Sequence, residues 1–164
     1  AMQILWSSSE QQAIRPISAN NLTRKFNALA ELTQQKDLRP LVGFDMFQDL
    51  IQNPTSTANA ALLDGESYAY NGRTFTFDGL KYVLAHLFFA NYITDNVEDT
   101  FTGMVVKSNE DSQPASAGDK KNLQNMARET AMQYWEDCKQ YIEANIGNYP
   151  YYDCKPPNKR LITF

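Results

Sequence analysis

The sequence predicts a mainly α-helical fold, a compact helical bundle with one small β-hairpin and extended N- and C-terminal arms. Apolar residues recur at helical spacing in several segments, most regularly between residues 119 and 146. An Asn-Gly pair between two β-prone runs predicts the hairpin. The length of 164 residues suits a single core. We therefore expect an N-terminal arm over residues 1–16, a helical domain over 17–147 and a C-terminal tail over 148–164.

Charge and hydropathy exclude two classes of protein. The net charge is −4 and the isoelectric point is about 5.0, whereas a protein that grips DNA phosphates carries clustered Lys and Arg. DNA can pass nearby, but we expect no specific binding. The longest apolar stretch, Tyr82 to Ile93, is much shorter than the ~20 residues that span a bilayer. The N-terminus carries no secretion signal, so we expect no membrane anchor and synthesis in the cytoplasm.

Two cysteines are too few for a disulfide framework. We interpret Cys138 and Cys154 as free thiols, Cys138 in the core and Cys154 in the proline-rich tail. A bridge between them stays an alternative.

The N-terminal segment holds Trp6 before a polar run without helical periodicity, and is therefore expected to be an arm. An aromatic residue on an arm suits an interface between proteins. In the alternative interpretation, Trp6 folds back onto its own domain.

Three helical segments are expected before the hairpin. The first begins at Ser18 or Asn20 and runs to about residue 35, with apolar residues on one face. Residues 37–40 break the pattern, and a second helix follows from 41 to 53. A short turn over 59–63 stops at Gly65.

The hairpin is predicted at about residues 67–77. Tyr68 to Tyr70 and Thr74 to Phe77 flank Asn71-Gly72, the pair favoured where both turn residues need positive φ. A two-stranded ribbon is marginal alone. It must therefore pack on helices or add to a neighbour's sheet, which makes Tyr70 and Phe75 candidate interface residues.

Two long helices form the predicted core. Asp78 caps the first, about residues 79–95, which is apolar on two faces and so belongs at the centre. Residues 100–107 look extended and 108–118 look like a loop. The second helix begins at Asp119 and stops near Gly147.

Catalytic and metal-binding patterns are missing from the sequence. His86 is the only histidine, and a buried, hydrogen-bonded core residue is the favoured interpretation. Asp95, Glu98 and Asp99 match no calcium loop, so a solvated helix end is preferred over a cation site. With no phosphate-binding loop or nucleophile motif, we predict no enzyme, no catalytic residue, no metal and no cofactor.

The C-terminal tail carries further candidate interface residues. Tyr149, Tyr151 and Tyr152 lie beside prolines and either cap the bundle or contact a partner. Residues 161–164, Leu-Ile-Thr-Phe, can add a strand to another subunit's sheet or fray. The candidate interface set is Trp6, Tyr70, Phe75, Tyr149, Tyr151, Tyr152, Leu161 and Phe164.

Several short sequence segments resemble those of a family of head-to-tail connector proteins of tailed bacteriophages. The family is found in crAss-like and related gut-bacterial phages and prophages. The segments are Ile14-Arg-Pro-Ile-Ser-Ala-Asn20, Leu62-Leu-Asp-Gly65, Phe77-Asp-Gly-Leu-Lys-Tyr-Val-Leu-Ala85, Asp99-Thr-Phe-Thr-Gly-Met-Val-Val-Lys107 and Tyr141-Ile-Glu-Ala-Asn145 with Tyr149-Pro150.

The resemblance implies a structural adaptor subunit that forms a twelve-fold ring beneath the portal protein. The ring would contact tail or further adaptor proteins, surround the DNA channel and lie in the virion neck after assembly in the host cytoplasm. A second hypothesis is a small helical protein-binding module, a regulator or inhibitor from a mobile element. The mass of the purified complex discriminates between the two.

Overall fold

The structure is a computed structural model that describes residues 2–98 and 117–152. The elements are α1 (Ser8–Ile14), α2 (Ala19–Thr33), the π-helix η1 (Gln34–Leu38), α3 (Arg39–Val42), α4 (Phe44–Gln52), α5 (Thr57–Asp64), β1 (Ser67–Tyr70), β2 (Arg73–Thr76), α6 (Leu80–Glu98), α7 (Ala117–Ala144) and the 3₁₀ turn η2 (Ile146–Asn148). The predicted mainly helical fold with one antiparallel hairpin is confirmed.

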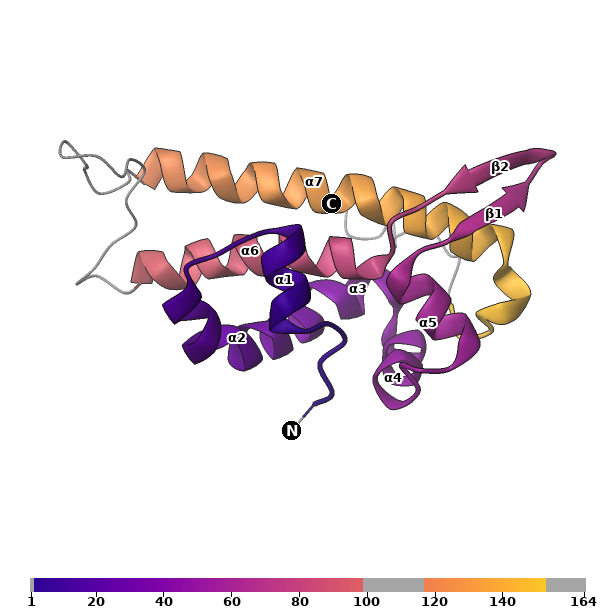
Figure 1. The fold of residues 1–164 in the computed structure, drawn as a ribbon, viewed down its shortest axis with the longest axis horizontal. Coiled ribbons are helices and arrows are strands. Elements are labelled where there is room, and N and C mark those ends of the chain that lie inside the picture. Colours follow the sequence, from indigo (N-terminus) through magenta and orange to yellow (C-terminus); the bar gives the residue numbers. More distant parts are fainter. Residues whose placement is uncertain (1, 99–116, 153–164) are drawn as a thin grey trace, which may run out of the picture.

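Helices α6 and α7 lie side by side and antiparallel, and the shorter helices pack around α6 (Figure 1). The residues of α6 from Val83 to Phe88 and from Ala90 to Ile93 are buried. The prediction that this helix is apolar on two faces and central is confirmed. On α7 only one stripe is buried, and it contains Ala127, Ala131, Trp135, Cys138 and Ile142.

The N-terminal segment is not an extended arm, so that expectation is wrong for residues 5–14. Ser7 caps α1 through a capping box with Glu10. The amide N–H of Leu5 donates to Gln34 Oε1 at 2.8 Å. Gln11 is fully buried and its Nε2 donates to the carbonyl oxygen of Ala85 on α6 at 3.1 Å. The helix is short, so these contacts and not its periodicity hold it in place.

The chain also stays helical where a break was expected, over residues 37–40. The N–H of Arg39 donates to Gln34 O in the wider π-helical register, and Pro40 stands in the first turn of α3, where it needs no donor. Gly43, with φ of 87°, separates α3 from α4. The predicted second helix is therefore two helices.

A polar cluster joins η1 to the two long helices. Asn91 of α6 donates to Thr33 Oγ1 at 3.0 Å and to Asp37 Oδ2 at 2.8 Å. Arg128 of α7 donates to Asp37 Oδ1 at 3.1 Å and to Asn91 Oδ1 at 3.3 Å. At another point, Lys81 of α6 pairs with Glu10 and Asp64 at 2.7 and 2.8 Å. The small helices are thus attached to the long pair by charges as well as by apolar packing.

Candidate functional site

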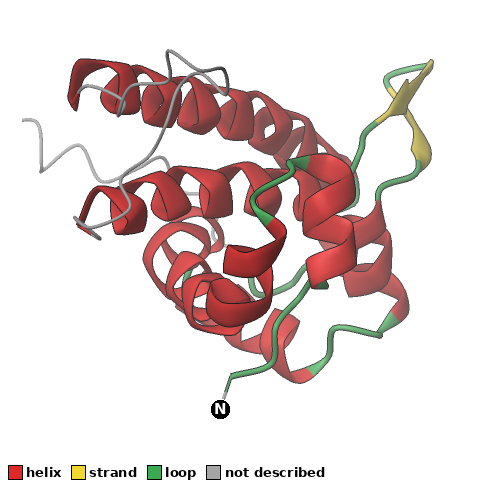
Figure 2. Ribbon diagram, turned by 60° about the vertical axis from the view of Figure 1, so that its left-hand side comes forward, coloured by secondary structure: helices red, strands yellow, loops and turns green. Residues whose placement is uncertain are grey.

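The β-hairpin projects from the helical body and is the element most available to another protein (Figures 1 and 2). Its strands pair with Tyr68 opposite Phe75 and Tyr70 opposite Arg73. Asn71 and Gly72 have φ of 51° and 76°, which is the turn that the sequence predicted.

One face of the hairpin is aromatic. Strand alternation places Tyr68, Tyr70 and Phe75 on this face, and all three are half-buried. Tyr68 stacks on Phe75 with ring centroids 5.8 Å apart, and Tyr70 lies 6.4 Å from Phe75. The two predicted interface residues of the hairpin, Tyr70 and Phe75, are therefore brought together.

The opposite face carries small, exposed side chains, those of Ser67, Ala69, Thr74 and Thr76. The hydroxyls of Ser67 and Thr76 lie 2.9 Å apart across the strands. Because residues flanking a two-residue turn hydrogen-bond to each other, the backbone N–H and C=O groups of Ala69 and Thr74 point to the outer edges. Among the described residues no third strand pairs with either edge.

The base of the hairpin is fixed on the C-terminal part of α7. The Tyr68 ring meets the Tyr141 ring edge-on at 5.1 Å, and Gln140 Nε2 donates to the Tyr68 hydroxyl at 3.0 Å. The Phe77 ring stacks on Tyr141 at 4.3 Å, and the Tyr141 hydroxyl donates to Glu66 Oε1 at 2.5 Å. Burial, followed by the hydrogen bond to Glu66, raises the pKa of Tyr141 well above its usual value.

Three exposed carboxylates gather beside this base. Burial, and then the negative charges of Asp78 and Glu136, raise the pKa of Asp137. Asp137 also lies near enough to the hairpin to raise the pKa of Tyr68, after burial as the main cause. No ion pair to these three carboxylates occurs among the described residues. The hairpin therefore stands next to an unbalanced acidic cluster, Asp78, Glu136 and Asp137.

The tyrosines that follow α7 divide in their roles. Tyr149 is buried and its hydroxyl donates to the carbonyl oxygen of Ala58 at 2.6 Å, so it caps the bundle, which was one of the two predicted alternatives. Tyr152 is half-buried against the core. Tyr151 is 57% exposed and is the tyrosine of this group that stays available to a partner.

Trp6 is not an interface residue of the isolated chain. It is 3% exposed, and its ring lies edge-on to Phe26 at 5.6 Å and Phe88 at 6.1 Å. Its Nε1–H donates to Gln11 Oε1 at 2.9 Å. The expectation of an interface anchor here is corrected, because the polar end of the indole finds a buried partner within its own domain.

Other predicted residues lie where the structure gives no description. Leu161 and Phe164 lie outside the described residues, as do Cys154 and Asp99. Asp95 and Glu98 are in the last turn of α6, with side chains that are not described. Cys138 is a buried free thiol, as predicted.

His86 is buried, as predicted, and stacks on Tyr134 at 5.4 Å with the rings 8° from parallel. Its Nδ1 has no hydrogen-bond partner among the described residues, so the prediction of a hydrogen-bonded core histidine is wrong for this atom. Burial, and then the nearby Arg15 cation, lower the pKa of His86 to about 4.

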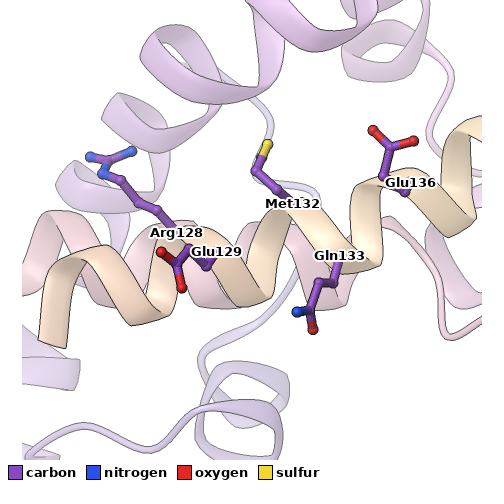
Figure 3. Close-up of a pocket in the computed structure, with 5 residues that line it drawn as sticks. All are labelled: Arg128, Glu129, Met132, Gln133 and Glu136. Carbon is purple, nitrogen blue, oxygen red and sulfur yellow. The ribbon is translucent and has the colours of Figure 1, made fainter. Parts of the chain in front are cut away.

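An open surface pocket of about 490 Å³ lies against α7. Its described lining residues are Arg128, Glu129, Met132, Gln133 and Glu136. Figure 3 shows Arg128, Met132 and Glu136 on one side of the helix and Glu129 and Gln133 on the other. The spacing of four residues between Arg128, Met132 and Glu136 is the sequence signal that could have found this face. Its mixed charges favour no single class of ligand.

Phe44 is the most exposed large apolar side chain among the described residues, at 73%. The guanidinium carbon of Arg39 lies 4.7 Å from the centroid of its ring. Phe44 is the first residue of α4, directly after Gly43, and its side chain lies on the surface.

Within residues 2–98 and 117–152, no helix is both long and apolar enough to cross a membrane. Among the side chains that the structure describes, which do not include Asp95 and Glu98, no group of three His, Cys, Asp or Glu could hold a metal ion.

Comparison with known proteins gives one match. No curated protein and no solved structure matches the chain. Residues 38–162, most of the chain, match a family described as a family of unknown function, DUF6712. This range begins at the last residue of η1 and contains the hairpin, the acidic cluster and both long helices. The chain therefore belongs to the DUF6712 family of unknown function.

Proposed function

We propose that this protein is a head-to-tail connector subunit of a tailed bacteriophage. It is a structural virion protein that assembles as a ring of twelve copies, joins the portal protein to the tail or to further adaptor proteins, and surrounds the DNA channel. Its place is the neck of the virion, which it reaches from the host cytoplasm during assembly.

The observation that carries the proposal is the projecting hairpin, whose two edges pair with no other described strand. A ring of identical subunits needs a heterologous contact, in which one part of a subunit reaches a different part of the next. The hairpin suits this role because its base is fixed by Tyr141 while its strands extend away from the helices.

The charge of the chain also supports a channel component. The net charge is −4, and the Asp78, Glu136 and Asp137 carboxylates have no described cationic partner. DNA phosphates are repelled by such a surface, so DNA can move past it without being held.

The mass of the complex with the portal protein tests the proposal. Purified chain is mixed with assembled portal rings, and native mass spectrometry counts the copies that bind. The expected result is a closed set of twelve copies per portal ring. Binding of one or two copies, or of none, would contradict the connector function and favour a monomeric binding module.

A matched pair of variants locates the contact. Tyr70→Ser with Phe75→Ser removes two of the three aromatic side chains of the hairpin face, whereas Leu32→Ser removes an exposed apolar side chain from α2. We expect the first variant to lose ring formation and the second to keep it, with equal helical content by circular dichroism. Equal ring formation by both would count against the hairpin as the contact.

A further inference from the structure

We propose that residues 161–164 of a neighbouring copy pair with the outer edge of β2 as a third, antiparallel strand. The inference rests on the proposed ring assembly and names the contact that would join its subunits. Residues 161–164 themselves lie outside the described residues. The site that receives them is described. It consists of the outer edge of β2, the aromatic face of the hairpin and the neighbouring acidic cluster.

No strand in the described part of the chain pairs with the outer edge of β2, and β2 itself carries no feature that blocks a strand. The register directs the backbone groups of Thr74 and Thr76 away from β1. Exposed edges are normally protected by Pro, by inward-pointing charges or by bulges, and β2 has a regular register without proline. Its one charged residue, Arg73, stands at the turn. Two strands alone are also marginally stable, so a third strand stabilises the hairpin.

The sequence Leu161-Ile-Thr-Phe164 matches this edge in length and in pattern. Both segments have four residues, and β-branched and aromatic residues favour strands. With Leu161 opposite Thr76 and Phe164 opposite Arg73, Ile162 falls opposite Phe75. Ile162 and Phe164 then extend the aromatic face of the hairpin, and cross-strand pairs of aromatic and β-branched residues are stabilising.

The same register brings opposite charges together. Lys159 and Arg160 precede the strand-forming residues, and Lys159 falls opposite Asp78, two residues beyond the end of β2. Asp78 belongs to the acidic cluster with Glu136 and Asp137, which has no described cationic partner. This complementarity selects the antiparallel direction, since a parallel strand would place Lys159 at the far end of β2, beside Arg73.

The chain is long enough to reach a neighbour. Tyr152 follows Tyr149, which packs 6.0 Å from Tyr141 beneath the hairpin. The eight residues 153–160 can extend by about 26–29 Å before the strand begins. The hairpin extends beyond the helical body, where a segment of an adjacent subunit can reach it (Figure 2).

Disulfide cross-linking tests the inference in the portal-bound complex. Cys154→Ser removes the second thiol, and Cys138 is buried. One population carries Thr74→Cys and the other Thr163→Cys, and the two are mixed before assembly. The proposed register places these residues opposite each other, at the Cα separation of about 5.5 Å that a disulfide accepts. We expect a dimeric cross-link that needs both populations.

Ser67→Cys is the matched control, since Ser67 is also an exposed hydroxyl residue on the same face but lies on β1. It should form no cross-link with Thr163→Cys. A chain that carries Thr74→Cys and Thr163→Cys together and closes an internal disulfide within the ring would overturn the inference. A twelve-copy ring that forms without the cross-link would also overturn the inference. Failure to form any ring would contradict the proposed function, and this inference with it.

Charge reversal tests the register separately. Asp78→Lys should lower the cross-link yield about two- to fivefold, the range expected for an exposed ion pair. Asp78→Lys combined with Lys159→Asp should restore the yield. A yield that Asp78→Lys leaves unchanged would overturn the proposed pairing of Lys159 with Asp78.

Discussion

Gly65 and Gly79 bring the two ends of the hairpin segment into direct backbone contact. A Cβ atom on Gly65 would lie 2.3 Å from Phe77 O, and a Cβ atom on Gly79 would lie 2.3 Å from Leu63 O. Both glycines have positive φ, 82° and 102°. The chain segments before and after the hairpin therefore cross so closely that neither Gly65 nor Gly79 can be replaced by a residue with a side chain without a clash.

Gly79→Ala is expected to lower the free energy of unfolding by about 3 kcal/mol or more, because it adds a clash with fixed backbone to the cost of positive φ. Gly43→Ala is the matched control, with φ of 87° and nothing within 4 Å of a Cβ. It should cost less, about 1–3 kcal/mol, because only the positive φ opposes the side chain there. Urea denaturation measures both, and equal losses would show that the crossing is not tight.

Trp6→Ala should destabilise the protein by about 3–5 kcal/mol, the range for a large aromatic residue removed from a core. Trp6 is 3% exposed and packs against Phe26 and Phe88. Phe44→Ala, at a residue 73% exposed, should change stability by about 0.5 kcal/mol or less. If Trp6→Ala lowered the melting temperature only slightly, the result would contradict the packing of Trp6 in the core and would support the expectation of an N-terminal arm.

Arg128→Met should lower the free energy of unfolding by about 1–3 kcal/mol. Asp37, whose side chain is 12% exposed, then loses its ion-pair partner at 3.1 Å. The variant that combines Asp37→Asn with Arg128→Met should lose less than the sum of the two single changes. A double-mutant cycle in urea measures the difference. Strict additivity would mean that the pair contributes nothing to joining η1 to α7.

The stability of the protein should fall as the pH drops from about 6.5 to 4. The pKa of His86 is about 4 in the folded state and 6.5 as the ordinary value, so in this window the unfolded state binds more protons. The loss from this group approaches about 3 kcal/mol at the acid end. Carboxyl groups also titrate in this pH window. The contribution of His86 is therefore measured by comparing the protein with a variant that lacks the imidazole.

His86→Phe keeps the stacking on Tyr134 and removes the titrating group. Melting temperatures of both proteins from pH 7 to pH 4 should diverge, with the smaller decrease in the variant. Parallel curves would show that His86 does not contribute to the acid sensitivity.

The elements that the sequence predicted best are those with a strong local signal. Asn71-Gly72 determines the hairpin turn on its own, and the long apolar period after Asp119 determines α7. Gly65 ends α5 as predicted, because its φ of 82° suits glycine.

The predictions from sequence were wrong in segments whose conformation depends on contacts with distant parts of the chain. Helix α1 has seven residues, too few for a periodic pattern, although Ser7 and Glu10 form a capping box that was visible in the sequence. The π-helix before Arg39 is held by the Asp37 and Asn91 contacts, which join segments far apart in the chain.

The candidate surface was predicted in part. Tyr70 and Phe75 share a face because strand alternation is visible in the sequence. The acidic cluster was not predicted, since Asp78 and Asp137 meet only after α7 folds back along α6.

Hydrogen–deuterium exchange of the hairpin in the portal-bound complex tests the central claim most directly. The amides of Thr74 and Thr76 point to the outer edge of β2 and should exchange fast in the free chain. The proposed assembly predicts strong protection of both in the ring, with little change at Phe75, whose amide already pairs within the hairpin. Fast exchange at Thr74 and Thr76 in a complete ring would contradict a contact through this edge.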